Sequence, residues 1–387
     1  VTIYFNNNGI FDSDFKVEVV NQVNNEDATS VDLVTGDFNG DEFLDLAGAN
    51  AANDTVAIII SNGDGTFMTA QNEETDLETN PQGLATADFN NDGRDDLAIS
   101  CTGTGQVKIW RSQAGRGVPD FEFIEDAVID VGGAPIGIDP GEVEEDKGLD
   151  HIDLVVALNG EGKVGVLRNN STSEVIEFLF DPADDKHVVG QGPTSVALAD
   201  LDGDAHVDIV TANPADGSIS ILLHNETSAA EFLASVDLPV GTAARSVALA
   251  DLDDDGDQDI ALIAIGEDGG TFGLYVLRND SNLTNYEQLL IAPAEGFTIK
   301  GIPVLVDDGD LDSNGVPDLV TINDAGSGLR GESGTLGLVR SDPACPDDLD
   351  GSGVVDISDL LLLLADWSDP YTIKDLLQLL GSWGPCP

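Results

Sequence analysis

The chain has 387 residues, and 41% of them are hydrophobic, which is enough to build one large domain and one small one. It carries 73 Asp and Glu residues against 15 Lys and Arg residues, so its formal net charge is −58. That charge argues strongly against nucleic acid and against anionic membranes as partners. Carboxylates at this density repel one another, so the folded chain needs bound cations or a saline medium.

The acidic composition does not indicate disorder, because apolar residues alternate regularly between turns of Gly, Asn and Asp. The longest apolar run, residues 360–365, is far shorter than the roughly 18 residues that cross a bilayer, so we expect no membrane insertion. Val1 already has a strand-like context, which favours a secreted, mature chain whose leader has been removed. We therefore expect an extracellular or cell-surface protein.

Internal repetition is the strongest feature of the sequence. Five copies of one acidic unit occupy residues 34–46, 86–97, 198–209, 249–260 and 310–319, and a degenerate sixth copy at residues 142–150 fills the double gap between the second and third. The strand after this sixth copy aligns better through Asp153 than through Asp150. Each unit reads as four short antiparallel strands, and such repeats are typical of propeller blades. A run of β-sandwiches is the alternative, but the unit is too short for one.

The loops of these units share the pattern Asp-x-Asp/Asn-x-Asp-Gly-x-x-Asp, and flanks such as residues 192–200 recur beside them. On these motifs, residues 1–340 resemble the VCBS and FG-GAP repeat family, which includes the propellers of integrin α-subunit heads. The resemblance implies an all-β fold, a β-propeller of about six or seven four-stranded blades. Residues 341–387 are predicted to form a separate, small α-helical domain.

Each acidic loop has the spacing of a calcium site, because Ca²⁺ takes about six to eight oxygen ligands. Alternate residues of an extended loop point the same way, so positions 1, 3 and 5 converge, position 9 closes the site, and the carbonyl of position 7 adds an oxygen. Gly at position 6 permits the turn in three loops (Gly93, Gly256 and Gly315), and Glu42 and Ala205 replace it in two others. The predicted ligands are Asp37, Asn39, Asp41, Asp45, Asp88, Asn90, Asp92, Asp96, Asp200, Asp202, Asp204, Asp208, Asp251, Asp253, Asp255, Asp259, Asp310, Asp312, Asn314 and Asp318.

We predict a structural calcium ion in each of these five loops, with metal binding linked to folding. Magnesium fits less well, because it prefers a rigid octahedron and keeps its waters. The alternative is that Asp, Asn and Gly only form good turns, but turns do not require acids at four fixed offsets in five loops. The sequence does not decide whether residues 142–153 also bind calcium.

After residue 341 the hydrophobic period changes from that of strands to that of helices. Residues 348–359 match an EF-hand-like calcium loop, and residues 357–367 and 373–383 repeat one helix at a spacing of 16 residues. This segment resembles a dockerin domain, although the acidic half of the second loop is missing, so we predict one calcium ion here. The ligand set comprises the Val354 carbonyl and the side chains of Asp348, Asp350, Ser352, Asp356 and Asp359.

Two of the three cysteines, Cys345 and Cys386, bracket this C-terminal segment, and we expect them to form a disulfide in an oxidising compartment. Cys101 follows a predicted strand and is expected to be a buried thiol. Whether a cohesin-type partner exists stays open. Five calcium ions in the propeller and a sixth in the C-terminal segment leave a net charge of about −46, so most carboxylates are expected on a solvated surface.

Residues 2–11 resemble the third strands of the repeats, which brings the number of third strands to seven against six acidic loops. One interpretation is that the N-terminal strand completes the last blade or contributes to a partial seventh blade. The other is that one terminal strand pairs with the sheet edge of a neighbouring subunit, which would build filaments. The sequence does not decide between monomer and polymer.

The usual catalytic motifs are absent, including His-Glu-x-x-His, Gly-x-Ser-x-Gly, the P-loop and Cys-x-x-Cys. We therefore predict no enzyme, and interpret the protein as a secreted, calcium-stabilised propeller for extracellular structure, adhesion or matrix assembly. Its expected partner is another protein or a second copy, with cell-surface or matrix glycans as further candidates. The alternatives are a self-assembling filament subunit and a carbohydrate-binding or carbohydrate-cleaving propeller, which the aromatic content of 5% disfavours.

The sequence contains six Asn-x-Ser/Thr sequons, and most of them are expected at exposed turns just after the third strand of a repeat. They begin at Asn53, Asn169, Asn170, Asn225, Asn279 and Asn282. Whether any of them carries a glycan stays open.

Overall fold

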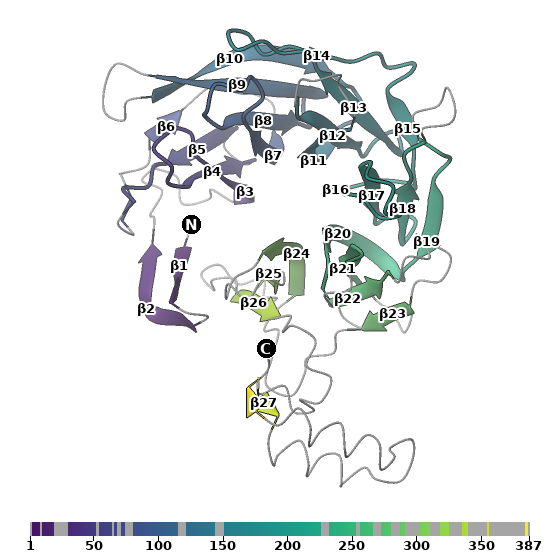
Figure 1. Ribbon diagram of the computed structural model, residues 1–387. Coiled ribbons are helices and arrows are strands. Elements are labelled where there is room, and N and C mark those ends of the chain that lie inside the picture. The colour runs from purple at the N-terminus through teal and green to yellow at the C-terminus, as the bar shows by residue number, and fades with distance from the viewer. Residues whose placement is uncertain are drawn as a thin grey trace, which may run out of the picture.

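The structure is a computed structural model in which short sheets follow one another around a ring (Figure 1). The described residues are 2–7, 10–18, 30–51, 54–63, 66–67, 71–73, 80–114, 121–143, 151–225, 232–252, 256–265, 272–279, 287–290, 302–309, 318–324, 335–339, 354–355 and 384–385. These residues form strands, turns and loops but no helix. Within them, no helix is long and apolar enough to span a membrane.

Five sheets have four or five antiparallel strands and form blades of a β-propeller. The first two blades are β3 (Ser30–Gly36), β4 (Asp45–Asn50), β5 (Thr55–Ile59) and β6 (Gln71–Glu73), then β7 (Pro81–Ala87), β8 (Asp96–Cys101), β9 (Gln106–Ala114) and β10 (Phe121–Asp130). The third blade is β11 (Pro135–Gly141), β12 (Asp153–Leu158), β13 (Lys163–Asn169), β14 (Phe178–Leu179) and β15 (Lys186–Val188). The last two are β16 (Ser195–Ala199), β17 (Asp208–Asn213), β18 (Ser218–Leu222) and β19 (Val236–Pro239), then β20 (Thr242–Ala250), β21 (Asp259–Ile265), β22 (Phe272–Arg278) and β23 (Glu287–Leu290).

Three further sheets are smaller. They are β24 (Ile302–Gly309) with β25 (Asp318–Asp324) and β26 (Thr335–Val339), the hairpin of β1 (Thr2–Asn7) and β2 (Ile10–Glu18), and the pair of β27 (Val354–Val355) and β28 (Gly384–Pro385). The predicted all-β propeller is confirmed, whereas the count of six or seven blades stays a prediction. The predicted helices at 357–367 and 373–383, and both Cys345 and Cys386, lie outside the described residues.

The second strand of every repeat begins at the aspartate that was predicted to close the loop. These strands are β4 at Asp45, β8 at Asp96, β12 at Asp153, β17 at Asp208, β21 at Asp259 and β25 at Asp318. The alignment of the degenerate copy through Asp153 is therefore confirmed. The fully described loops, residues 37–45, 88–96 and 200–208, consequently lie at the same end of their blades, between the first and second strands.

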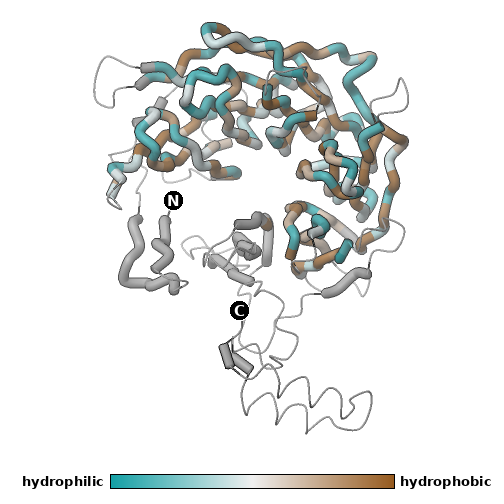
Figure 2. Tube along the Cα trace, in the orientation of Figure 1, coloured by the Kyte–Doolittle hydropathy of each residue, from teal (hydrophilic) through white to brown (hydrophobic). Residues whose placement is uncertain are grey.

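The hydrophobic cores lie between adjacent sheets, because the second strands of the five blades are buried on both faces. Val155 of the third blade, for example, shares one cluster with Ile209 of the fourth, and Val306 of β24 joins residues of the fifth blade in another. Figure 2 shows hydrophobic stretches in each of the five blades. Cys101 is fully buried and is not part of a disulfide, as predicted for this thiol.

Side chains near the end of the third strand join the second, third and fifth blades to the blade before them. The Asn169 Nδ2 of the third blade donates to the Phe89 carbonyl of the second at 2.9 Å, and the Asn279 Nδ2 of the fifth donates to the Leu201 carbonyl of the fourth at 2.8 Å. The Ser112 hydroxyl donates in the same way to the first blade. These contacts act as latches between neighbouring blades.

The latches change the interpretation of the sequons. Asn169 and Asn279 are both buried, so the expectation that these sequons lie at exposed turns is wrong for them. The reason is that their amides are needed inside the interface between blades. Asn170, in contrast, is exposed.

Removing one latch tests this arrangement against a neighbouring control. Asn169→Ala leaves the buried Phe89 carbonyl and the half-buried Ile152 carbonyl without their donor, so we expect the free energy of unfolding to fall by about 1–3 kcal/mol in urea denaturation. Asn170→Ala removes an exposed amide that bonds only to Glu177 among the described contacts, and should change stability by less than about 0.5 kcal/mol. Equal effects of the two substitutions would contradict the latch.

Candidate metal centre

Three acidic loops, residues 37–45, 88–96 and 200–208, are described completely, and they have one shared geometry. In each loop the carboxylate of the first aspartate accepts hydrogen bonds from backbone N–H groups that follow it, so the loop curves around this carboxylate. Asp200 accepts the Asp204 N–H on Oδ1 at 3.2 Å and the Ala205 N–H on Oδ2 at 2.8 Å. Asp37 and Asp88 accept the N–H groups of positions 5 and 6 in the same way, at 2.7–3.0 Å. Sequence spacing and backbone geometry therefore agree in all three loops.

Position 6 adopts a left-handed backbone conformation, as the predicted turn requires. The φ angle is 88° at Gly93 and 94° at Gly256, where glycine accepts it without strain. It is 70° at Glu42 and 71° at Ala205, so these two side chains occupy a conformation that costs about 1 kcal/mol. Gly315 lies outside the described residues.

The closing aspartate at position 9 is buried and joins three stretches of its blade. Asp45 accepts the Phe38 N–H at 3.2 Å on one oxygen and the Ser61 N–H at 2.9 Å on the other. Each closing aspartate thus holds position 2 of its loop and the end of the third strand. The same pair of bonds recurs at Asp96, Asp153, Asp208 and Asp259.

This second role of position 9 is not evident from the ligand pattern. The one sign of this role in the sequence is in the degenerate copy. There the closing aspartate, Asp153, is retained although the other acidic residues of the loop do not align with those of the five good copies. In that loop the closing aspartate follows its position-2 donor by ten residues rather than seven. Residues 144–150 lie outside the described part of the chain, so calcium binding by this loop stays undecided.

Burial raises the pKa of the closing aspartates. Desolvation is the largest cause and raises the pKa of Asp96 from its ordinary 3.8 to about 8, with repulsion from Asp92 and Asp88 adding to it. Desolvation likewise raises the pKa values of Asp45 and Asp208 to about 6, while backbone N–H bonds act in the opposite direction. A divalent cation in the loop would favour the ionised carboxylates.

The predicted ligands converge most clearly in the loop of residues 200–208. Asp200, Asp202 and Asp208 each place a carboxylate oxygen within 4.8 Å of the others. Asp204 is not part of this group, and its Oδ1 accepts the His206 N–H at 2.9 Å. An all-oxygen set of this kind suits a hard cation such as calcium.

The remaining predicted ligands are described in part. Asp251 accepts the Gly256 N–H at 2.9 Å, as in the other loops, and Asp318 begins β25. Those that lie outside the described residues are Asp253, Asp255, Asp310, Asp312, Asn314, Asp348, Asp350, Ser352, Asp356 and Asp359.

The comparisons with known proteins agree with the repeat. Residues 37–99 and 200–262 match the model of the FG-GAP-like repeat, and each match begins at the first aspartate of an acidic loop. Together with the blades, these matches support an FG-GAP β-propeller. No curated protein matches the sequence.

One solved structure that resembles the chain is a candidate 6-phosphogluconolactonase from Bacteroides uniformis ATCC 8492. It is 13% identical, the match covers 64% of this chain and 68% of that chain, and the TM-score is 0.43. At this TM-score the similarity carries no argument about function.

The raised pKa values predict how stability depends on pH without metal. Protonated Asp96 is favoured in the folded state, so its contribution is complete below pH 3.8 and is lost as the pH rises through about 8. The melting temperature of the metal-free protein should therefore fall between pH 6 and 8, and Asp96→Asn should flatten this part of the curve. Asp184→Asn, an exposed control, should leave the slope unchanged. A slope unaffected by Asp96→Asn would contradict the assignment.

Proposed function

We propose that the protein is a secreted, calcium-stabilised, non-enzymatic β-propeller that serves extracellular structure, adhesion or matrix assembly. The observation that carries the proposal is the recurrence of one loop geometry in three blades, each with an aspartate or asparagine at the same four positions. In each loop Ca²⁺ would be held by the residues at positions 1, 3, 5 and 9. The ion would neutralise a cluster of like charges and fix the turn between two strands.

The net charge of −58 supports the same proposal. Few cations are available within the chain to balance it, and Arg111, for example, pairs at 2.6 Å with Asp126, which is not one of the predicted ligands. Calcium is abundant outside cells, where a protein of this charge would also be screened by salt. In the same proposal, β24–β26 would form a sixth blade and β1–β2 would form part of a seventh. Residues 341–387 would form a dockerin-like cassette that holds one calcium ion and the Cys345–Cys386 disulfide.

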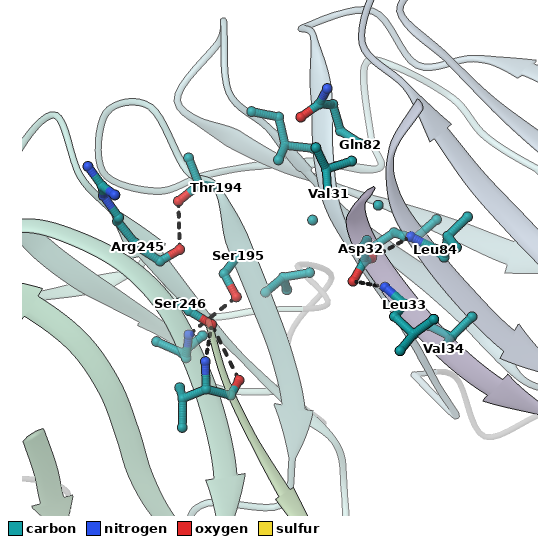
Figure 3. Close-up of a pocket in the computed structure, with 17 residues that line it drawn as sticks. Val31, Asp32, Leu33, Val34, Gln82, Leu84, Thr194, Ser195, Arg245 and Ser246 are labelled. Carbon is teal, nitrogen blue, oxygen red and sulfur yellow. Dashed lines mark hydrogen bonds between the residues drawn. The ribbon is translucent and has the colours of Figure 1, made fainter. Parts of the chain in front are cut away.

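A cavity of about 320 Å³ lies where the inner strands of the blades meet (Figure 3). Its lining combines aliphatic side chains with polar ones such as Thr194, Ser195 and Arg245, and contains no aromatic residue. Asp32 is the one carboxylate in the lining, and it accepts the N–H groups of Leu33 and Leu84. The paired carboxylates of a glycosidase and the aromatic platforms typical of sugar sites are thus missing from this lining, so we rank the carbohydrate alternative below the structural one.

Calcium binding is tested by removing one predicted ligand beside a matched control. Asp202→Asn and Asp184→Asn each remove one exposed negative charge, but only Asp202 belongs to an acidic loop. In calorimetric titration, Asp202→Asn should weaken one calcium site by about tenfold or more, and Asp184→Asn should leave every site unchanged. Excess EDTA should lower the melting temperature of the unmodified protein. An unchanged melting temperature would overturn the calcium proposal.

A further inference from the structure

The acidic loops of the first and second blades are in direct contact with each other. Asp95, at position 8 of the second loop, accepts the Asp37 N–H on Oδ2 at 2.7 Å, and its own N–H donates to the Asp37 carbonyl at 3.0 Å. Beside it, Arg94 Nε donates to the Asn39 carbonyl at 3.3 Å. Asp37 and Asn39 are the predicted ligands at positions 1 and 3 of the first loop. Two neighbouring residues of one loop therefore hold the backbone of two ligand positions in the other.

The two loops approach so closely that glycine stands at both points of contact. A Cβ atom at Gly36 would lie 3.1 Å from a carboxylate oxygen of Asp95, and a Cβ atom at Gly40 would lie 3.1 Å from Arg94 Nε. Both distances are shorter than an ordinary van der Waals contact. A shift of one loop is consequently transmitted to the other.

This contact is a property of position 8 in the second loop. The same position is Leu44 in the first loop and Val207 in the loop of residues 200–208, and neither side chain has a hydrogen-bond acceptor. Asp95 is half-buried and is not one of the predicted calcium ligands. Its carboxylate therefore serves the neighbouring loop rather than its own.

Asp95 also lies between two predicted ligands of its own loop, Asp92 at position 5 and Asp96 at position 9. An ion held by both would fix the short stretch between them, and with it the carboxylate of Asp95. Asp37 in turn begins the first loop, where its carboxylate accepts the N–H groups of positions 4 to 6. Ordering of the second loop would thus reduce the conformational entropy that an ion in the first loop must still remove.

We propose that the first and second acidic loops bind calcium cooperatively, and that Asp95 is the positioning residue that couples them. The inference rests on the proposed calcium binding and adds a regulation to it, because the two sites fill together. An ion in either loop also reduces the attraction of the other loop for a cation. Physiological salt screens this opposing effect, so the coupling is measured in salt.

A titration that resolves single loops tests the coupling. Amide hydrogen exchange of residues 40–42, followed against free calcium, reports the midpoint at which the first loop becomes protected. Asp92→Asn weakens the second loop and should raise the midpoint of the first by about fivefold or more. Asp204→Asn is the matched change at position 5 of the loop of residues 200–208, which makes none of the described contacts with the first loop, and should leave that midpoint unchanged.

Coupling between two binding sites is reciprocal, so the titration is repeated from the other side. Asp41→Asn in the first loop should raise the midpoint of residues 91–93 in the second loop by about the same factor. A first-loop midpoint that Asp92→Asn does not shift, or that Asp204→Asn shifts equally, would refute the coupling.

Two substitutions of Asp95 test its role with every predicted ligand in place. Asp95→Ala removes the acceptor of the Asp37 N–H, whereas Asp95→Asn removes the same charge but keeps an acceptor oxygen. Asp95→Ala should raise the first-loop midpoint by about fivefold and abolish its dependence on Asp92, and Asp95→Asn should retain most of that dependence. Equal behaviour of the two variants would show that Asp95 does not couple the loops. Urea denaturation of the metal-free variants checks that both are folded.

The same titrations separate this inference from the proposed function. If calcium protects the loops but each fills independently, only the coupling fails. If calcium protects none of the loops, the proposed calcium binding fails as well.

Discussion

A buried carboxylate that accepts two backbone N–H groups is the interaction on which each blade depends. Asp208, for example, binds the Leu201 N–H at the start of its loop and the His224 N–H beyond the third strand. One side chain thereby joins the loop, the second strand and the end of the third strand. A buried charge is costly unless it is well partnered, and the two bonds supply only part of that compensation. The buried carboxylate therefore needs a further partner, and the proposed cation would supply it.

Contacts between blades depend on this clamp in turn. The residue held by the clamp at Asp153 is Asn169, whose amide then reaches the Phe89 carbonyl in the preceding blade. Phe89 is itself the residue whose N–H binds Asp96, the clamp of that blade. Loop geometry in one blade and the latch of the next therefore share a residue. A substitution in one acidic loop is therefore expected to disturb first the contact between its blade and the next blade in the ring.

The sequence predicted the features that repeat at short range. Alternating apolar residues gave the strands, and four acids at fixed offsets gave the loops, including the left-handed turn that Gly93 and Gly256 adopt. It did not predict the latches, because Asn169 and Phe89 are 80 residues apart and an Asn-x-Ser sequence reads equally well as an exposed turn. Nor did it predict the exposure of Leu33, since that residue has the same local pattern as its buried counterpart Leu84. Both depend on which sheet lies next to which, and a repeat pattern alone does not contain that information.

The placement of the cores between sheets has a consequence for how such a chain can change in evolution. Each cluster is shared by two adjacent sheets, as with Val155 and Ile209, so stability is close to a sum of single-sheet and nearest-neighbour contributions. Duplication of one repeat adds a sheet that brings both of its packing faces with it, and deletion of one repeat joins two faces that already match. The number of sheets is therefore a property that whole-repeat insertions and deletions can vary while the packing rules of the remaining sheets stay the same.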